Sequence, residues 1–239
     1  MNSKNSKSLS ILFLGVMVIL VIPFIASCGK SDSSVSATSN IQMQVLNLSP
    51  DLLPINLYAN LRRNTNQYRY PIPSGYFSIG PFDTLFQIRS AVVTNAAAVN
   101  ILSIDTTLSS NVKYSLFVTG FKASNTIDYI LTSDTSAAPV SGRGKVRFVN
   151  ATAGPNIFHI TANGASVFTN QAYKSVSKFV EMPAGNYLFK IYNQASSTTV
   201  LSELPSVTVQ DGKLYTLYCR GIVGRTDTAA FGMAVLSNR

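Results

Sequence analysis

The chain has 239 residues, enough for one large domain or two of ordinary size, and its 46% of hydrophobic residues allows a packed core. The net charge is +9, which favours anionic lipid or acidic polysaccharide as neighbours over nucleic acid if the chain is exported. The two cysteines, Cys28 and Cys219, are too few for a disulfide framework or a cysteine metal cluster, and we expect no cofactor. Alternatively, the positive net charge reflects scattered lysines and arginines that only keep the surface soluble.

Residues 1–27 have the three zones of a secretory signal peptide. A polar start carrying Lys4 and Lys7 precedes an apolar run of about 12 residues, short of the roughly 20 that span a bilayer. The run leads into Ile25-Ala26-Ser27-Cys28, which resembles the lipobox of bacterial lipoproteins. The resemblance implies cleavage before Cys28 and attachment of acyl chains such as palmitate to that cysteine. The alternative is an uncleaved membrane anchor with an incidental cysteine.

Residues 28–40 are the predicted lipid anchor and a Ser-rich tether, which would let a folded part stand off the membrane. Gly29, in place of Asp, disfavours inner-membrane retention by resemblance to proteobacterial sorting. Lys30 and Asp32 resemble the charged tags of surface lipoproteins in the Bacteroidetes. We therefore expect a lipid-anchored protein of the cell envelope, at the outer membrane, and leave open whether it faces the periplasm or the surface.

From residue 41 onward the pattern is that of β-strands. The segment 112–120 alternates apolar and polar residues with period two, as does 84–89, and turn residues separate the runs. When the chain is displaced by 103 positions, Asn47 meets Asn150 and Phe86 meets Phe189, and the displacement becomes 101 where Tyr114 meets Tyr215. The chain therefore contains an internal repeat.

We predict an all-β fold with two tandem immunoglobulin-like antiparallel β-sandwich domains. The first spans residues 41–134, the linker 135–143 and the second 144–239. Alternate residues of each strand should line the cores, among them Phe86 and Ile88 in the first copy and Phe189 and Ile191 in the second.

The repeated motifs resemble those of an extracytoplasmic family, the domain of unknown function 4397. They are Asn47-Leu48-Ser49-Pro50 with its degraded copy Asn150-Ala151-Thr152, the turn Pro183-Ala-Gly-Asn-Tyr187, and Gly212-Lys-Leu-Tyr-Thr216. The first copy departs from the turn, with Gly80-Pro-Phe-Asp83 in its place. The resemblance covers nearly all of residues 41–237, implies tandem copies on a Bacteroidetes-like lipoprotein, and brings no catalytic residues.

Known catalytic and metal-binding motifs are missing from the sequence. His159, the only histidine, lies between two residues that we place inward, so we expect it to be an exposed structural histidine; a Ser-His-Asp triad is the alternative. Cys219 aligns with Val118, which favours a buried thiol over a reactive one. We therefore predict that the chain is not an enzyme.

One segment of the first copy stands out as a candidate ligand site, because arginine and aromatic side chains together can stack on sugars or hold acidic groups. It contains Arg62, Arg63, Tyr68, Arg69 and Tyr70, and the matching stretch of the second copy has no arginine. The alternative is a solvated hairpin.

Three triplets, Asp83-Thr84-Leu85, Asp105-Thr106-Thr107 and Asp227-Thr228-Ala229, resemble the sites at which Bacteroidetes attach O-linked glycans. The resemblance implies possible modification of Thr84, Thr106 and Thr228.

Taken together, these features predict an exported lipoprotein that acts as a non-catalytic binding or spacer module for glycan or protein. The alternatives are an accessory subunit of an outer-membrane uptake complex and a hydrolase of envelope or nutrient polymers. A hydrolase would need convergent carboxylates, and nothing in the sequence brings the two glutamates, Glu181 and Glu203, together. No nucleic-acid partner is expected.

Overall fold

The computed structural model describes residues 40–91 and 97–238, in which strands and turns occur without a helix. The predicted signal peptide, Cys28 and nearly all of the tether therefore lie outside the described residues. No helix in these two ranges is long and apolar enough to cross a membrane. The part of the chain from residue 39 onward forms one compact unit.

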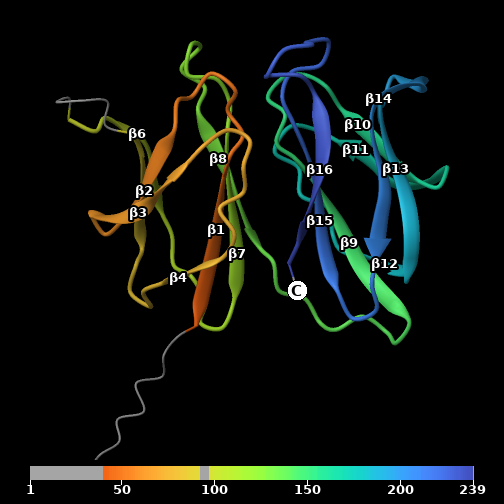
Figure 1. Ribbon diagram of the computed structural model, residues 1–239, viewed down its shortest axis with the longest axis horizontal. Helices are drawn as coiled ribbons and strands as arrows, with labels where there is room; N and C mark the ends of the chain where they lie inside the picture. The colour runs from red at the N-terminus through yellow and green to blue at the C-terminus, as the bar shows by residue number, and fades with distance from the viewer. Residues whose placement is uncertain (1–39, 92–96, 239) are drawn as a thin grey trace, which may run out of the picture. The chain divides into compact units, whose positions relative to one another are not determined.

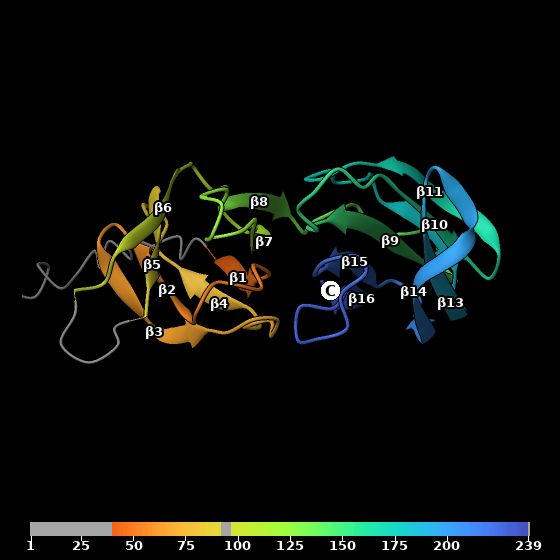
Figure 2. The same cartoon turned by 90° about the horizontal axis from the view of Figure 1, so that it is seen from above.

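Within the described residues, the first repeat has eight strands in two sheets, ordered β4-β1-β7-β8 and β3-β2-β5-β6. The strands are β1 (Ile41–Asn47), β2 (Ile55–Ala59), β3 (Arg62–Tyr68), β4 (Phe77–Ile79), β5 (Leu85–Ser90), β6 (Asn100–Asp105), β7 (Lys113–Thr119) and β8 (Asp128–Ser133). Figures 1 and 2 show its two sheets as separate layers.

The second repeat follows the same plan, with sheets ordered β12-β9-β15-β16 and β11-β10-β13-β14. Its strands are β9 (Arg143–Asn150), β10 (Phe158–Ala162), β11 (Ala165–Gln171), β12 (Val180–Pro183), β13 (Gly185–Asn193), β14 (Ser196–Val209), β15 (Leu214–Arg220) and β16 (Gly232–Ser237). The predicted all-β fold of two repeated sandwich units is confirmed.

Each repeat contains one parallel strand pair among otherwise antiparallel neighbours. β1 pairs with β7 in parallel, with Val45 opposite Leu116, and β9 pairs with β15 in the same way. Parallel partners need a long connection between them, and the intervening strands of both sheets supply it. The pattern of alternation alone does not distinguish this pairing from an antiparallel one.

The predicted turns form where the residues accept a left-handed backbone. Asn163 and Gly164, between β10 and β11, have φ values of 49° and 85°, as in a type I′ hairpin. Gly120 and Gly221 follow β7 and β15 at equivalent positions. A Cβ would lie 2.0 Å from a backbone oxygen at Gly120 and 2.3 Å from one at Gly221, so only glycine fits at either position.

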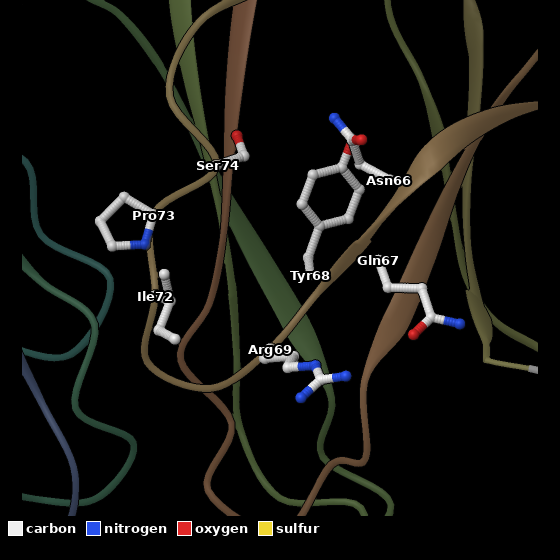
Figure 3. A pocket seen from close by; sticks show the side chains of 7 residues that line it. All are labelled: Asn66, Gln67, Tyr68, Arg69, Ile72, Pro73 and Ser74. Carbon is white, nitrogen blue, oxygen red and sulfur yellow. The ribbon is translucent and has the colours of Figure 1, made fainter.

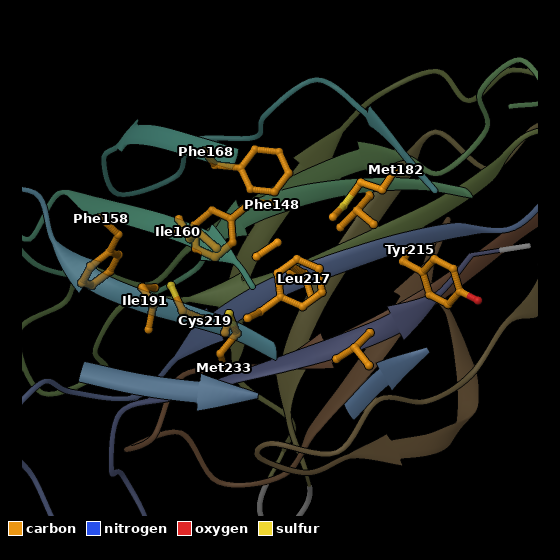
Figure 4. Packing of buried hydrophobic residues seen from close by; sticks show 14 of the residues in the cluster. Phe148, Phe158, Ile160, Phe168, Met182, Ile191, Tyr215, Leu217, Cys219 and Met233 are labelled. Atoms are coloured by element: carbon orange, nitrogen blue, oxygen red, sulfur yellow. The ribbon is translucent and has the colours of Figure 1, made fainter. Parts of the chain in front are cut away.

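A separate apolar core fills the space between the two sheets of each repeat. Phe86 and Ile88 are buried in the first, and Phe189 and Ile191 are buried in the second, as the alternation predicts. Figure 4 shows the second core, in which Cys219 also packs. Burying a side chain of this kind contributes roughly 1.5–3 kcal/mol, so each repeat carries its own stabilising centre.

A third buried cluster joins the repeats through the sheets that contain β1 and β9. Its members are Leu46, Leu48, Phe117, Ile130, Val149, Ala151, Tyr218 and Leu236. Phe117 and Tyr218, which are equivalent in the repeat, lie with ring centroids 5.9 Å apart. Equivalent residues in mutual contact are the mark of an approximate two-fold interface. The sequence pattern did not predict this contact.

Candidate functional site

Two hollows lie along one edge of the first repeat, where its two sheets end. β3 is the edge strand of one sheet and β4 is the edge strand of the other. β3 begins at the hairpin turn Asn60-Leu61 and ends at Tyr68, beside the start of β2. This edge carries the arginine-rich segment predicted as a ligand site.

The larger hollow has a volume of about 340 Å³. It is lined by Asn66, Gln67, Tyr68, Arg69, Ile72, Pro73 and Ser74. Figure 3 shows the residues from 72 to 74 on one side and those of the β3 segment on the other. Its wall therefore combines an apolar side, from Ile72 and Pro73, with amide and guanidinium groups.

The smaller hollow, about 180 Å³, lies nearer the β2–β3 hairpin turn. Its lining includes Arg62, Arg63 and Asn64 from β3, residues of β4, and Asp83. Asp83 is already engaged, because its carboxylate accepts hydrogen bonds from the Gly80 amide at 3.0 Å and from Asn60 Nδ2 at 3.1 Å. The two arginines are the cationic groups of this hollow.

The arginine and tyrosine side chains of the predicted ligand site lie in different environments. Arg62, Arg63 and Arg69 are exposed, whereas Tyr68 is only 2% exposed and its ring stacks on Phe77 in the core. Burial also raises the pKa of Tyr68 well above its ordinary value. Tyr68 therefore forms the floor of the larger hollow and offers no free ring face to a sugar.

Tyr70 belongs to the contact between the repeats. The guanidinium of Arg220, at the end of β15, lies over the Tyr70 ring, 5.8 Å from its centroid. The hydroxyl groups of Tyr70 and of its equivalent Tyr173 are both buried and have no hydrogen-bond partner among the described residues. We therefore assign Tyr70 to the joint between repeats, where sequence analysis had grouped it with the ligand site.

Within the described part of the chain, the arginines of this edge have no carboxylate partner. None of the ion pairs between described residues includes Arg62, Arg63 or Arg69, and Arg63 donates one hydrogen bond, to Asn56 Oδ1 at 3.3 Å. At the equivalent positions the second repeat has Ala165, Ser166 and Ala172. The cationic edge is thus a property of the first repeat alone.

The other groups considered from the sequence do not form a catalytic site in the described part of the chain. His159 is half-buried; its Nε2 lies 2.9 Å from Ser166 Oγ and its ring lies beside Tyr192. Glu181 and Glu203 lie on β12 and β14, in different sheets, and pair with Lys145 and Lys190.

Metal ligands are also dispersed. In residues 40–91 and 97–238, no three His, Cys, Asp or Glu side chains lie close enough to hold a metal ion. Cys219 is fully buried, as predicted, and burial raises the pKa of its thiol to about 12. A thiol in this environment is not a nucleophile at neutral pH.

Of the threonines in the three predicted glycosylation triplets, Thr84 and Thr228 lie beside or in turns, and Thr106 directly follows β6. Thr84 and Thr228 are exposed, whereas Thr106 is half-buried. Thr84 and Thr106 are neighbours, because the Thr106 amide donates a hydrogen bond of 2.9 Å to the Thr84 carbonyl oxygen. Their modification remains a prediction.

Two features of the surface were not predicted from the sequence. One is a hollow of about 490 Å³ whose lining includes Asp51, Phe121, Ile222 and Arg225, from loops of both repeats. The other is a pair of exposed apolar side chains, Leu61 and Phe82, at one end of the first repeat. Comparison of the two repeats could have identified this pair. At a displacement of 103, Leu61 and Phe82 both align with glycine in the second repeat.

Comparisons with known proteins bear on family and fold. A family model, described as a domain of unknown function (DUF4397), matches residues 41–158 and 154–238. No curated protein matches the chain.

Two solved structures show a remote likeness. CBMbc of family CBM26, from Eubacterium rectale Amy13K and solved in complex with maltoheptaose, is similar at 11% identity and a TM-score of 0.24, covering 82% of this chain and 96% of that chain. The Bacillus anthracis TIE protein is similar at 11% identity and a TM-score of 0.22, covering 82% of this chain and 43% of that chain. At these TM-scores neither likeness indicates what this chain binds.

Proposed function

Because the chain belongs to the DUF4397 family, described only as a domain of unknown function, we propose a function from its own residues. It is a non-catalytic binding module of the cell envelope, anchored at the outer membrane by lipid on Cys28. Its ligand-binding edge is β3 of the first repeat, and its ligand is a glycan that carries acidic groups.

The observation that carries this proposal is a set of three arginines at one sheet edge, two on β3 and one directly after it, that form no ion pair with the described residues. Arg62, Arg63 and Arg69 are exposed, take part in none of the ion pairs of the described residues, and line two hollows on that edge. A guanidinium group presents a planar fork of donors that matches a carboxylate or a phosphate. A chain with several acidic groups could engage the three arginines together.

A glycan array tests the proposal with lipid-free protein starting at residue 29, because the compact unit begins at residue 39. We expect binding to glycans with uronate, sulfate or phosphate groups and none to their neutral counterparts. The test variant, Arg62→Ala/Arg63→Ser/Arg69→Ala, copies the residues of the second repeat. A wild-type protein that binds no acidic glycan would refute the glycan assignment.

A spacer role is the second candidate, and the interface between the repeats favours it. The apolar cluster around Phe117 and Tyr218, together with a buried ion pair, joins the repeats by more than their linker. Such a rigid pair would hold a ligand or partner at a fixed distance from the anchor. The two roles are compatible, and a wild-type protein without ligand would leave the spacer role as the better account.

A further inference from the structure

We propose that one end of the first repeat rests on the lipid bilayer to which the chain is anchored, with Leu61 and Phe82 in contact with the membrane. This end, here called the membrane tip, consists of Asn60, Leu61 and the turn Gly80–Asp83. The inference rests on the anchoring at Cys28 that we propose above. It adds a second, independent contact between the protein and the membrane.

The membrane tip exposes two large apolar side chains. Leu61 is 64% exposed and Phe82 is 85% exposed. The Asn60 side chain holds the two turns together, since its Nδ2 donates to the Phe82 carbonyl oxygen at 2.9 Å and its Oδ1 accepts from the Leu85 amide at 3.2 Å. The two apolar groups are therefore presented on one framework.

The same framework in the second repeat carries no apolar side chains at these positions. Asn163 there donates to the Asn186 carbonyl oxygen and accepts from the Leu188 amide at 2.8 Å. Gly164 and Gly185, however, stand where the first repeat has Leu61 and Phe82. The apolar side chains are thus additions to a turn structure that forms without them.

Leu61 also has a conformation that leucine rarely adopts. Its φ is 67°, in the left-handed region where its equivalent Gly164, with a φ of 85°, carries no strain. An exposed apolar residue with a strained backbone lowers stability, and strain of this kind is concentrated at functional contacts. A bilayer surface provides such a contact for an isolated apolar tip.

The position of the start of β1 favours the bilayer as the surface that the membrane tip contacts. Ile41, the first residue of β1, is paired with Ile79 of β4, and the turn that carries Phe82 follows directly. Figure 1 shows the start of β1 and β4 at the same end of the first repeat. About a dozen residues separate Cys28 from this point, and flexible linkers of that length typically span roughly 20 Å. The tether therefore holds the tip at high local concentration near the bilayer.

The charges around the tip suit a headgroup layer. Arg62 and Arg63 follow Leu61 directly, and long cationic side chains reach phosphate groups while their stems remain in apolar surroundings. Asp83 and Asp105 offset these two charges, and Asp83 is occupied by hydrogen bonds within the tip. Apolar contact therefore drives the association, which should depend only weakly on salt. With the tip on the bilayer, Arg62 and Arg63 lie at the headgroup layer, and Arg69 with the larger hollow, at the other end of β3, binds the ligand. In the lipid-free protein all three arginines are available to the ligand.

Tryptophan fluorescence tests the proposal, because the chain contains no tryptophan and a single substitution gives an unambiguous signal. The full chain, lipidated and reconstituted into vesicles of phosphatidylethanolamine and phosphatidylglycerol, carries Phe82→Trp. We expect blue-shifted emission that brominated acyl chains quench. The control is Leu53→Trp, since Leu53 is 63% exposed and precedes β2 at the opposite end of that strand. Its emission should stay that of a solvated indole.

Emission from Phe82→Trp that matches the lipid-free protein would overturn the proposal and would point to a protein partner for the tip. If the proposed lipid anchor at Cys28 is wrong, the result is different: the full chain does not float with the vesicles. In that event the lipid-free reporter, titrated with the same vesicles at higher lipid concentration, still decides whether the tip partitions. In a vesicle-sedimentation assay, which needs no tryptophan, the lipid-free variant Leu61→Gly/Phe82→Gly, which copies the second repeat, should bind the same vesicles at least about tenfold more weakly than wild type.

Discussion

Arg147 and Asp134 form an ion pair across the contact between the two repeats, with side chains only 4% and 0% exposed. Arg147 also donates from Nε to Thr216 Oγ1 at 2.9 Å, and Asp134 accepts from Ser115 Oγ at 2.6 Å. Their equivalents in the other repeat are Gln44 and Asn238, which are neutral. The repeats have therefore diverged at the interface into one charged and one neutral set of positions.

Breaking this pair should be costly, because each single substitution leaves a buried charge without its partner. We expect Arg147→Gln or Asp134→Asn to lower the free energy of unfolding by roughly 3–5 kcal/mol. The double variant, which installs the neutral residues of the other repeat, should recover much of that loss. Urea denaturation of all four proteins gives the coupling energy. Single variants within about 1 kcal/mol of wild type would contradict a structural role for the pair.

The strain at Leu61 predicts opposite effects at two equivalent turns. Leu61→Gly should raise stability by about 1 kcal/mol, since glycine accepts the positive φ that leucine resists. Gly164→Leu should lower stability by a similar amount, because its Cβ would meet no atom within 4 Å and the cost lies in the backbone alone. Thermal unfolding measures both. A loss of stability in Leu61→Gly would mean that its side chain stabilises the isolated fold.

Alkaline pH should destabilise the protein through its buried thiol. Burial raises the pKa of Cys219 to about 12, whereas the thiol of the unfolded chain ionises near its ordinary value of 9.0. The unfolded state therefore loses its proton first, and stability present below pH 9 falls as the pH rises, by about 1.4 kcal/mol per unit for this group.

The matched variant for this effect is Cys219→Val, which installs the residue found at Val118 in the first repeat. Its stability should fall less steeply between pH 9 and 10, because the buried tyrosines contribute equally to both proteins and only the thiol differs. Urea denaturation at several pH values gives the slopes. Equal slopes for the two proteins would show that Cys219 is more accessible than its position in the core indicates.

The intact mass of the mature chain tests the anchor and the three glycosylation triplets together. We expect a chain that starts at Cys28 and carries acyl groups, and Cys28→Ser should abolish both changes. A glycan on Thr84 or Thr106 would lie beside Phe82 and obstruct contact with a bilayer, so the membrane tip predicts that these two are unmodified. Full modification of Thr84 in the native host would argue against the tip.

The sequence predicts the fold well because core alternation and turn chemistry are local properties. The repeated pairs Phe86/Ile88 and Phe189/Ile191 point inward in both copies, and Asn163-Gly164 forms the expected hairpin. The parallel pairing of β1 with β7 was not predictable, since strands far apart in sequence carry no signal of relative direction.

The candidate site was only partly predictable for a related reason. The segment from Arg62 to Tyr70 does lie at a surface edge, but Tyr68 points into the core and Tyr70 faces the other repeat. A bulge in the β2–β3 pairing shifts the register, and long-range packing decides which aromatic rings remain free. The glycines aligned with Leu61 and Phe82 show that these two apolar side chains are not needed for the turns. That difference between the repeats points to a surface contact only once both turns are known to be exposed.

The most direct test of the account is the affinity for the acidic glycan that binds best on the array, measured by calorimetry for three lipid-free proteins. They are wild type, the variant Arg62→Ala/Arg63→Ser/Arg69→Ala, and a charge-matched control, Lys122→Ala/Lys178→Ala/Lys213→Ala, in which all three lysines are exposed. We predict about a hundredfold loss for the arginine variant and less than threefold for the lysine control. Equal losses in both variants would contradict a binding site on β3 and would leave only a general attraction between opposite charges.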